Sequence, residues 1–216
     1  MNKAEKFWDK LSRVYDQETK RFDELNDRVI KSTKKYLNVS DAVLEIGCGT
    51  GTLTTALACN VKTIHAIDVS SQMIELARMK ASERSIENIK FAQATVFDER
   101  LKPESFDTIL IFSVMHLLED TPKVMKRINE LLKPGGLFIS VTPCGGEIKR
   151  TLKSVIESII FVIDLIAKVG IVPVINMKSF KISELEKAIA NGNFNITAVE
   201  NMRSSEEHHF IAAKKI

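Results

Sequence analysis

The chain has 216 residues, of which 44% are hydrophobic, and its net charge of +3 comes from 31 basic and 28 acidic residues. This length and composition indicate one globular domain with a substantial core and exclude a disordered or fibrous chain. The nearly even charge balance argues against a dedicated binder of polyanions. The scattered cysteines form neither a disulfide framework nor a metal knuckle, and residues 1–10 lack the apolar run of a secretory signal. We therefore expect a reduced, cytoplasmic protein.

Apolar side chains recur at three- and four-residue steps through residues 3–37, which predicts one or two helices ahead of the first strand. Short apolar runs then alternate with amphipathic stretches. The expected strands are residues 42–46, 63–67, 89–94, 106–112 and 137–141, and the expected helices are residues 53–58, 72–84 and 121–132. This alternation predicts an α/β fold with a mostly parallel sheet and helices on both of its faces.

The last third of the chain follows a different pattern. Residues 183–190 predict a short helix with Ser183 as its N-cap and Glu186 completing a capping box. Residues 196–202 and 208–213 then predict two strands joined by the polar turn 203–207, which together make a closing antiparallel hairpin.

Residues 148–175 place charged side chains on one stripe of an otherwise apolar helix. The charges inside this stretch, and Pro173 at its end, argue against a membrane span. Two interpretations stay open: a helix packed on its own domain, or a lid or interfacial helix that covers an apolar substrate and makes peripheral contacts. We expect a single domain with a helical cap (1–40), a cofactor-binding core (41–142), a lid or insert helix (143–180) and a C-terminal helix with antiparallel strands (181–216).

The strongest local signal is the glycine-dense turn of the segment VLEIGCGTG at residues 43–51. Glycines permit a tight turn and let a ligand approach bare backbone. A dinucleotide fingerprint would need its third glycine at position 52, where Thr52 stands, so an NAD-dependent dehydrogenase is disfavoured. Asp68 ends the second expected strand, beside this turn, where its carboxylate can accept both hydroxyls of a ribose. The alternative is that Asp68 caps the following helix.

Together these residues resemble the class I S-adenosylmethionine-dependent methyltransferases. The segments SFDTIL (105–110) and LLKPGGL (131–137) are similar to further motifs of that family. Trp8 and the pair Tyr15-Asp16 resemble the cap helix of its small-molecule branch, which includes quinone-biosynthesis methyltransferases. The resemblance implies a Rossmann-like, seven-stranded sheet whose last strand is antiparallel, in agreement with the predicted hairpin.

The resemblance also implies roles for individual residues. Those that it assigns to cofactor binding are Glu45, Gly47, Cys48, Gly49, Gly51, Asp68, Val69, Met73, Thr95, Val96 and Phe112. The glycines and Glu45 would hold the methionine end of S-adenosyl-L-methionine, Asp68 the ribose, and Val69 and Met73 the adenine. Many relatives have Gly-Asp-Ala where this chain has residues 94–96. Thr95 or Asp98 would therefore take the place of that acid at the adenine amino group, and the Val96 amide would meet the ring.

Methyl transfer from a sulfonium is an in-line displacement, which leaves S-adenosyl-L-homocysteine and requires no metal. The four histidines lack metal-ligand spacing, and we expect no metal site. His116, just beyond the fourth strand, is the candidate general base, and its alternative role is to shield the cofactor. Tyr15 is the second catalytic candidate, through contact with the cofactor carboxylate or the acceptor, and core packing is its alternative.

The segment FSVM (112–115) has neither the Pro-Cys of RNA cytosine-5 methyltransferases nor the Asn/Asp-Pro-Pro-aromatic motif of enzymes that methylate base amino groups. The missing Pro-Cys also argues against a covalent role for Cys144. We therefore expect a small apolar or aromatic acceptor, methylated on oxygen, sulfur or carbon, and no nucleic-acid partner. The alternatives are an RNA or protein methyltransferase and a non-catalytic S-adenosylmethionine-binding partner or sensor domain.

Overall fold

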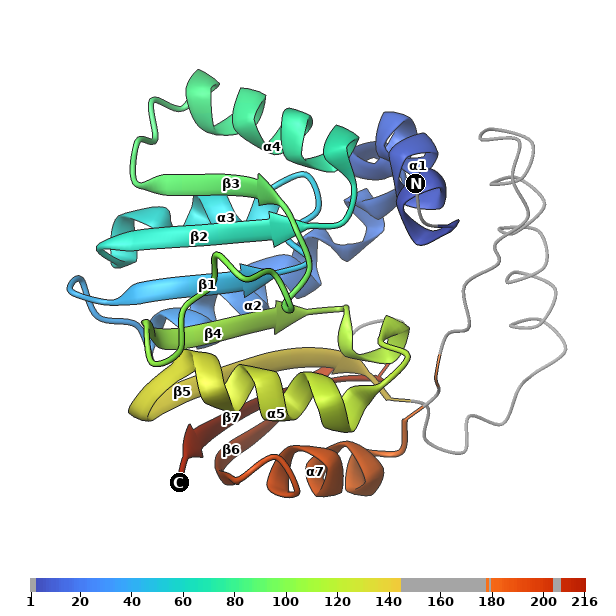
Figure 1. The fold of residues 1–216 in the computed structure, drawn as a ribbon. Helices are drawn as coiled ribbons and strands as arrows, with labels where there is room; N and C mark the ends of the chain where they lie inside the picture. Colours follow the sequence, from blue (N-terminus) through green and yellow to red (C-terminus); the bar gives the residue numbers. More distant parts are fainter. Residues whose placement is uncertain (1–2, 145–177, 179, 204–206) are drawn as a thin grey trace, which may run out of the picture.

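The structure is a computed structural model that describes residues 3–144, 178, 180–203 and 207–216. These residues form a seven-stranded sheet in the order β3-β2-β1-β4-β5-β7-β6 (Figure 1). Strand β7 runs antiparallel to both of its neighbours, β5 and β6, and the other six strands are parallel to one another. The predicted α/β fold, with an antiparallel last strand and a C-terminal hairpin, is confirmed.

The strands lie close to their predicted positions. They are β1 (Ala42–Ile46), β2 (Thr63–Asp68), β3 (Ile89–Gln93), β4 (Phe106–Phe112), β5 (Leu132–Pro143), β6 (Phe194–Arg203) and β7 (Glu207–Lys215). The bounds of β1 and β4 agree with the prediction, whereas β5 begins five residues before the predicted start at residue 137. Leu132 pairs with Phe106 ahead of a register shift, and Gly135 in the intervening bulge adopts a φ of +70°.

The helices cover both faces of the sheet, as the alternating pattern predicted (Figure 1). They are α1 (Lys3–Thr19), α2 (Asp23–Lys34), α3 (Thr52–Leu57), α4 (Ser71–Glu83), α5 (Thr121–Leu131) and α7 (Ile182–Ala190), with short 3-10 helices at Lys20–Phe22, Ala58–Asn60 and Met115–Leu117. Helices α5 and α7 pack on one face, and α2, α3 and α4 pack on the other. Helix α1 packs against α4 near the carboxyl ends of the parallel strands.

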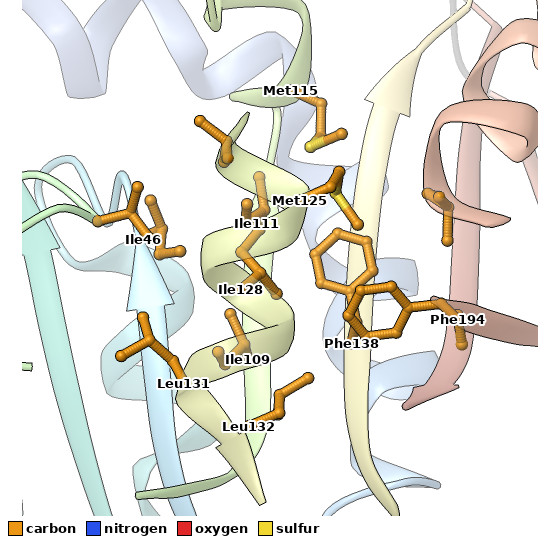
Figure 2. Close-up of a cluster of buried hydrophobic side chains, with 14 of the residues drawn as sticks. Ile46, Ile109, Ile111, Met115, Met125, Ile128, Leu131, Leu132, Phe138 and Phe194 are labelled. Carbon is orange, nitrogen blue, oxygen red and sulfur yellow. The ribbon is translucent and has the colours of Figure 1, made fainter. Parts of the chain in front are cut away.

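The hydrophobic core follows the alternation of side chains along the strands. In β4, Ile109 and Ile111 face α5, while Leu110 and Phe112 face the opposite layer. Figure 2 shows Met125 and Ile128 of α5 over this first face, next to the rings of Phe138 and Phe194, which are tilted relative to each other. These two ring centroids lie 5.6 Å apart. The sheet is thus buried on both sides, which leaves the carboxyl ends of its strands as the place for a site.

The predicted start of the C-terminal helix was wrong. Helix α7 begins at Ile182 with Lys181 as its N-cap residue, and Glu184, rather than Glu186, closes the first turn. The Glu184 carboxylate accepts the backbone N–H of Lys181, the N-cap residue, at 3.1 Å. Ser183 is the second residue of the helix and therefore cannot be its N-cap.

Two predictions fall wholly or partly outside the described residues: the helix over residues 148–175 and the turn at 203–207. Among the residues described, no helix has the length and apolar character needed to cross a membrane.

Candidate functional site

The glycine-dense turn leaves β1 at the carboxyl edge of the sheet and leads into α3. Gly47, Gly49 and Gly51 all adopt left-handed backbone conformations, with φ values of +74°, +53° and +74°. A Cβ atom at Gly47 would overlap the side chain of Val114, and one at Gly51 would lie 2.9 Å from the Cβ of Ala77. The turn therefore requires glycine both for its backbone angles and for its close approach to the β4 loop and to α4.

Asp68, the last residue of β2, holds this turn. Its Oδ2 accepts the Gly49 N–H at 2.9 Å and its Oδ1 accepts the Ser70 N–H at 2.9 Å. Ser70 itself caps α4, because its hydroxyl accepts the Met73 N–H at 3.1 Å. The alternative that Asp68 caps this helix is therefore wrong. A carboxylate has about four acceptor positions, so after these two bonds Asp68 can still accept two hydroxyl donors.

Glu45 lies under the turn and is 2% exposed. One of its carboxylate oxygens, Oε2, has no hydrogen-bond partner within the described part of the chain. Burial raises the pKa of Glu45 to about 7. A hydrogen bond from the Thr54 hydroxyl opposes this shift, and the Asp68 charge adds to it. Burial also raises the pKa of Asp68, and nearby Asp9 acts in the same direction. Asp68 thus raises the pKa of Glu45, and Asp9 raises that of Asp68, which shows that acidic side chains cluster at this edge, an arrangement that favours a cationic ligand.

Tyr15 reaches the same turn from α1. A Cβ atom built on Gly49 would lie 3.7 Å from Cε1 of Tyr15 and 3.9 Å from its hydroxyl oxygen. Burial raises the pKa of Tyr15 to about 12, with further contributions from Asp68 and Asp16. The phenol is therefore protonated at neutral pH and available as a hydrogen-bond donor. Its ring also meets the ring of Trp8 edge-on, with centroids 6.4 Å apart.

The segment after β3 supplies the part of the site predicted for adenine. Thr95 is exposed, and its hydroxyl accepts the Phe97 N–H at 3.3 Å. Asp98 is already engaged, because the backbone and guanidinium of Arg100 donate to its carboxylate at 2.7 to 2.9 Å. The hydrogen bonds from Arg100 lower the pKa of Asp98 to about 2. Thr95 is therefore the freer of the two predicted acceptors.

The remaining predicted cofactor residues flank this edge. Val69 follows β2 and is half-buried, whereas Val96, Met73, Cys48 and Phe112 are buried, with Met73 on α4 and Phe112 at the end of β4. Burial raises the pKa of the Cys48 thiol well above its usual value, so this cysteine is an inert neutral group.

His116 lies in the 3-10 helix Met115–Leu117, two residues after the Val114 that packs on Gly47. Burial lowers its pKa to about 4, and His208 adds to the effect. Its Nδ1 atom has no hydrogen-bond partner among the described residues. The imidazole is thus neutral at pH 7 and able to take a proton, and the same burial makes it a weaker base than an ordinary histidine.

Sequence reasoning missed Asp9 and Lys80, which help to fasten α1 to this edge, and it named Asp16 only as part of the Tyr15-Asp16 pair, without a role. Asp9 and Asp16 are seven residues apart on α1 and so lie on one face of the helix, a signal that the sequence contained. Lys80 carries no comparable signal, because its partners come from other elements. In the described ranges, no group of three His, Cys, Asp or Glu side chains could hold a metal ion.

Comparison with known proteins shows the family of this chain. The profile of a family described as "Methyltransferase domain" matches residues 37–166. The chain is 29% identical over 151 residues to the demethylmenaquinone methyltransferase of Staphylococcus aureus, which covers 64% of this chain and 61% of that protein. It is 34% identical over 118 residues to the ubiquinone biosynthesis O-methyltransferase of Haemophilus ducreyi, which covers 52% of this chain and 47% of that protein. The chain therefore spans about half of the length of the curated relatives that it matches.

The solved structure of the YcgJ protein from Bacillus subtilis is similar in fold, with a TM-score of 0.67 at 18% identity, and the similarity covers 88% of this chain and 97% of that one. The family profile covers more than half of the chain, and it includes the glycine turn, Asp68 and the β4 loop. From this profile, together with the seven-stranded sheet, we conclude that the chain belongs to the class I S-adenosylmethionine-dependent methyltransferase family.

Proposed function

We propose that this protein binds S-adenosylmethionine across the carboxyl ends of β1, β2 and β3 and transfers its methyl group to a small apolar or ring-containing acceptor. One observation carries the proposal: three glycines in left-handed conformations meet a carboxylate that retains free acceptor positions. The glycine turn offers bare backbone to the ligand, and Asp68 offers oxygen atoms to two ribose hydroxyls.

The charge of the edge fits this cofactor. S-adenosylmethionine carries a sulfonium and an ammonium group, and its methionine end would lie next to Glu45, while Asp68 would bind the ribose. The unpartnered Oε2 of Glu45 is a buried polar atom of the kind that a ligand or an ordered water satisfies. When bound, the cofactor supplies an electrophilic methyl group on sulfur, whose displacement needs no metal.

The chain's own residues would then place the acceptor and manage its proton. His116, neutral at pH 7, would accept the proton of a hydroxyl or thiol as the methyl group is transferred. Tyr15, protonated, would donate a hydrogen bond beside Gly49 to the cofactor carboxylate or to the acceptor. The aromatic side chains of α1, and two relatives named for quinone biosynthesis, support a ring-bearing acceptor.

A single-turnover assay with methyl-labelled S-adenosylmethionine tests the proposal. The label is offered separately to a small-molecule cell extract, to total RNA and to total protein. We expect label in a small organic product, and none when Asp68→Ala replaces the wild-type protein. Label in RNA or protein would contradict the acceptor class. Tight cofactor binding without any transfer would instead identify a non-catalytic binding domain.

A further inference from the structure

Helix α1 is fastened to the cofactor edge at three separate points. Gln93, the last residue of β3, donates to Oε1 of Glu5 at 2.9 Å. The Ser70 hydroxyl, just after β2, donates to Oδ1 of Asp9 at 2.6 Å. The Thr50 hydroxyl, in the turn after β1, donates to Oδ1 of Asp16 at 2.5 Å. Each acid thus bonds the end of a different strand, at the edge where Figure 1 shows α1.

Lys80 of α4 completes the third of these attachments. Its ammonium group donates to Oδ2 of Asp16 at 3.1 Å, to the Thr50 hydroxyl at 3.1 Å and to the Thr52 hydroxyl at 2.7 Å. These three acceptors use all three of its N–H donors. The Lys80 side chain is only 19% exposed. One ammonium group therefore joins α1, the glycine turn, the start of α3 and α4.

We infer that Lys80 is a positioning residue for the glycine turn, and that the junction of Lys80, Asp16 and Thr50 couples cofactor binding to the docking of α1. Thr50 lies between Gly49 and Gly51, so hydrogen bonds to its hydroxyl connect both α1 and α4 to the turn. Glycine gives this turn little intrinsic stiffness, and its ligand-ready shape must be supported by side chains around it. The inference rests on the proposed function, because the turn is the predicted cofactor site.

Coupling of this kind is reciprocal. If docked α1 and Lys80 hold the turn in its binding conformation, a ligand on the turn must stabilise docked α1 by the same free energy. Helix α1 also carries Trp8 and Tyr15, the aromatic side chains that support the proposal of a ring-bearing acceptor. Cofactor binding would therefore also stabilise the position of these two aromatic side chains.

The chain contains one tryptophan, Trp8, and it lies on α1. Its fluorescence therefore reports on this helix alone. We would measure quenching of Trp8 by acrylamide, with and without saturating S-adenosylhomocysteine, and the dissociation constant of this ligand by calorimetry. The variants are Lys80→Met and Asp16→Asn. The first removes the ammonium group of Lys80 and keeps an aliphatic side chain, and the second removes the charge of Asp16 and keeps the shape of its side chain. Lys126→Met, at an exposed position of α5, is the matched control.

In the wild-type protein and in Lys126→Met, we expect the ligand to reduce the quenching of Trp8. In Lys80→Met and Asp16→Asn, we expect stronger quenching without ligand and a dissociation constant raised by about tenfold, the size of one lost hydrogen bond to a charged group. The inference would be overturned if both variants bound S-adenosylhomocysteine as tightly as the wild type, or if the ligand did not change the quenching of Trp8 in the wild type. Either result would leave the proposed function intact. A wild-type protein that binds no S-adenosylhomocysteine would overturn both.

Discussion

Gly51 shows how much a single residue contributes to the proposed site. Its φ of +74° disfavours any residue with a side chain. A Cβ atom added at this position would lie only 2.9 Å from the Cβ of Ala77, which leaves no room for a side chain. Gly135 has nearly the same φ, +70°, but its added Cβ would meet only the flexible end of Lys214, at 3.4 Å. A comparison of alanine substitutions at these two glycines therefore separates the energetic cost of backbone strain from the cost of crowding.

We predict that Gly51→Ala lowers the free energy of unfolding by about 2–4 kcal/mol, since crowding adds to a backbone cost of about 1–2 kcal/mol. Gly135→Ala should show only the backbone cost. Urea denaturation at pH 7 measures both variants. Equal losses would mean that α4 moves aside freely and that the turn is not held by its close approach to Ala77.

Glu45 predicts an unusual dependence of stability on pH. Its pKa of about 7 in the folded protein lies above its ordinary value of 4.5, so the folded state binds the proton more tightly than the unfolded state. The contribution of Glu45 to the free energy of unfolding should therefore be greatest below about pH 4.5, and it should be lost as the pH rises through 7. Full ionisation of this carboxyl costs on the order of 3 kcal/mol.

Glu45→Gln removes this ionisation, so we predict that the variant gains stability relative to the wild type as the pH is raised from 5 to 8. Denaturant titrations of both proteins at the two pH values measure this difference. If the free energies of unfolding keep the same difference at pH 5 and pH 8, Glu45 ionises as an ordinary carboxyl, and it has a solvated or paired environment.

At the scale of elements, Asp107 connects the starts of three strands. Its Oδ2 accepts the Ala42 N–H at 2.9 Å, and its two oxygens accept the Lys133 ammonium at 2.7 and 2.8 Å. Burial acts to raise the pKa of Asp107, but the contacts with Lys133 and Ala42 outweigh it and the pKa is lowered. The segments SFD and LKPGG thus meet in space, where one carboxylate ties β1, β4 and the β5 bulge together.

We predict that Asp107→Asn lowers the free energy of unfolding by about 1 kcal/mol at pH 7, a small value because the pair is partly exposed to solvent. Because the folded pKa is lowered, this contribution is present above the unfolded pKa and is lost as the pH falls through the folded one. Lys133→Met leaves the hydrogen bond between the Ala42 N–H and Asp107 in place, so this variant should lose less free energy of unfolding than Asp107→Asn. A loss in Asp107→Asn that is the same at pH 3 and pH 7 would refute this explanation.

The sequence predicted the order and position of the elements because strand and helix periodicity, and the glycines of the turn, are local signals. It failed where the deciding contact is distant along the chain. The N-cap of α7 is Lys181 rather than Ser183, and it follows a β-bridge between Cys144 and Phe180. Strand β5 starts earlier than predicted because Leu132 pairs with Phe106. Lys80 was missed because Asp16 lies 64 positions before it in the chain.

At the scale of the whole molecule, the strand order explains why the site lies where it does. Strand β1 has β2 on one side and β4 on the other, and the chain leaves β1 toward α3 on one face but leaves β4 toward α5 on the opposite face. Connections that diverge in this way open a crevice at the carboxyl ends of the strands, where ligands bind in open α/β sheets. The contact between Gly47 and Val114 lies at this point.

The most direct test of this account is a calorimetric titration of the purified protein with S-adenosylmethionine and, separately, S-adenosylhomocysteine, with NAD as the control ligand. We predict saturable binding of one molecule of each adenosyl ligand per chain and no binding of NAD. The absence of adenosyl binding, or preferential binding of NAD, would contradict the assignment of the glycine turn and Asp68 as an S-adenosylmethionine site.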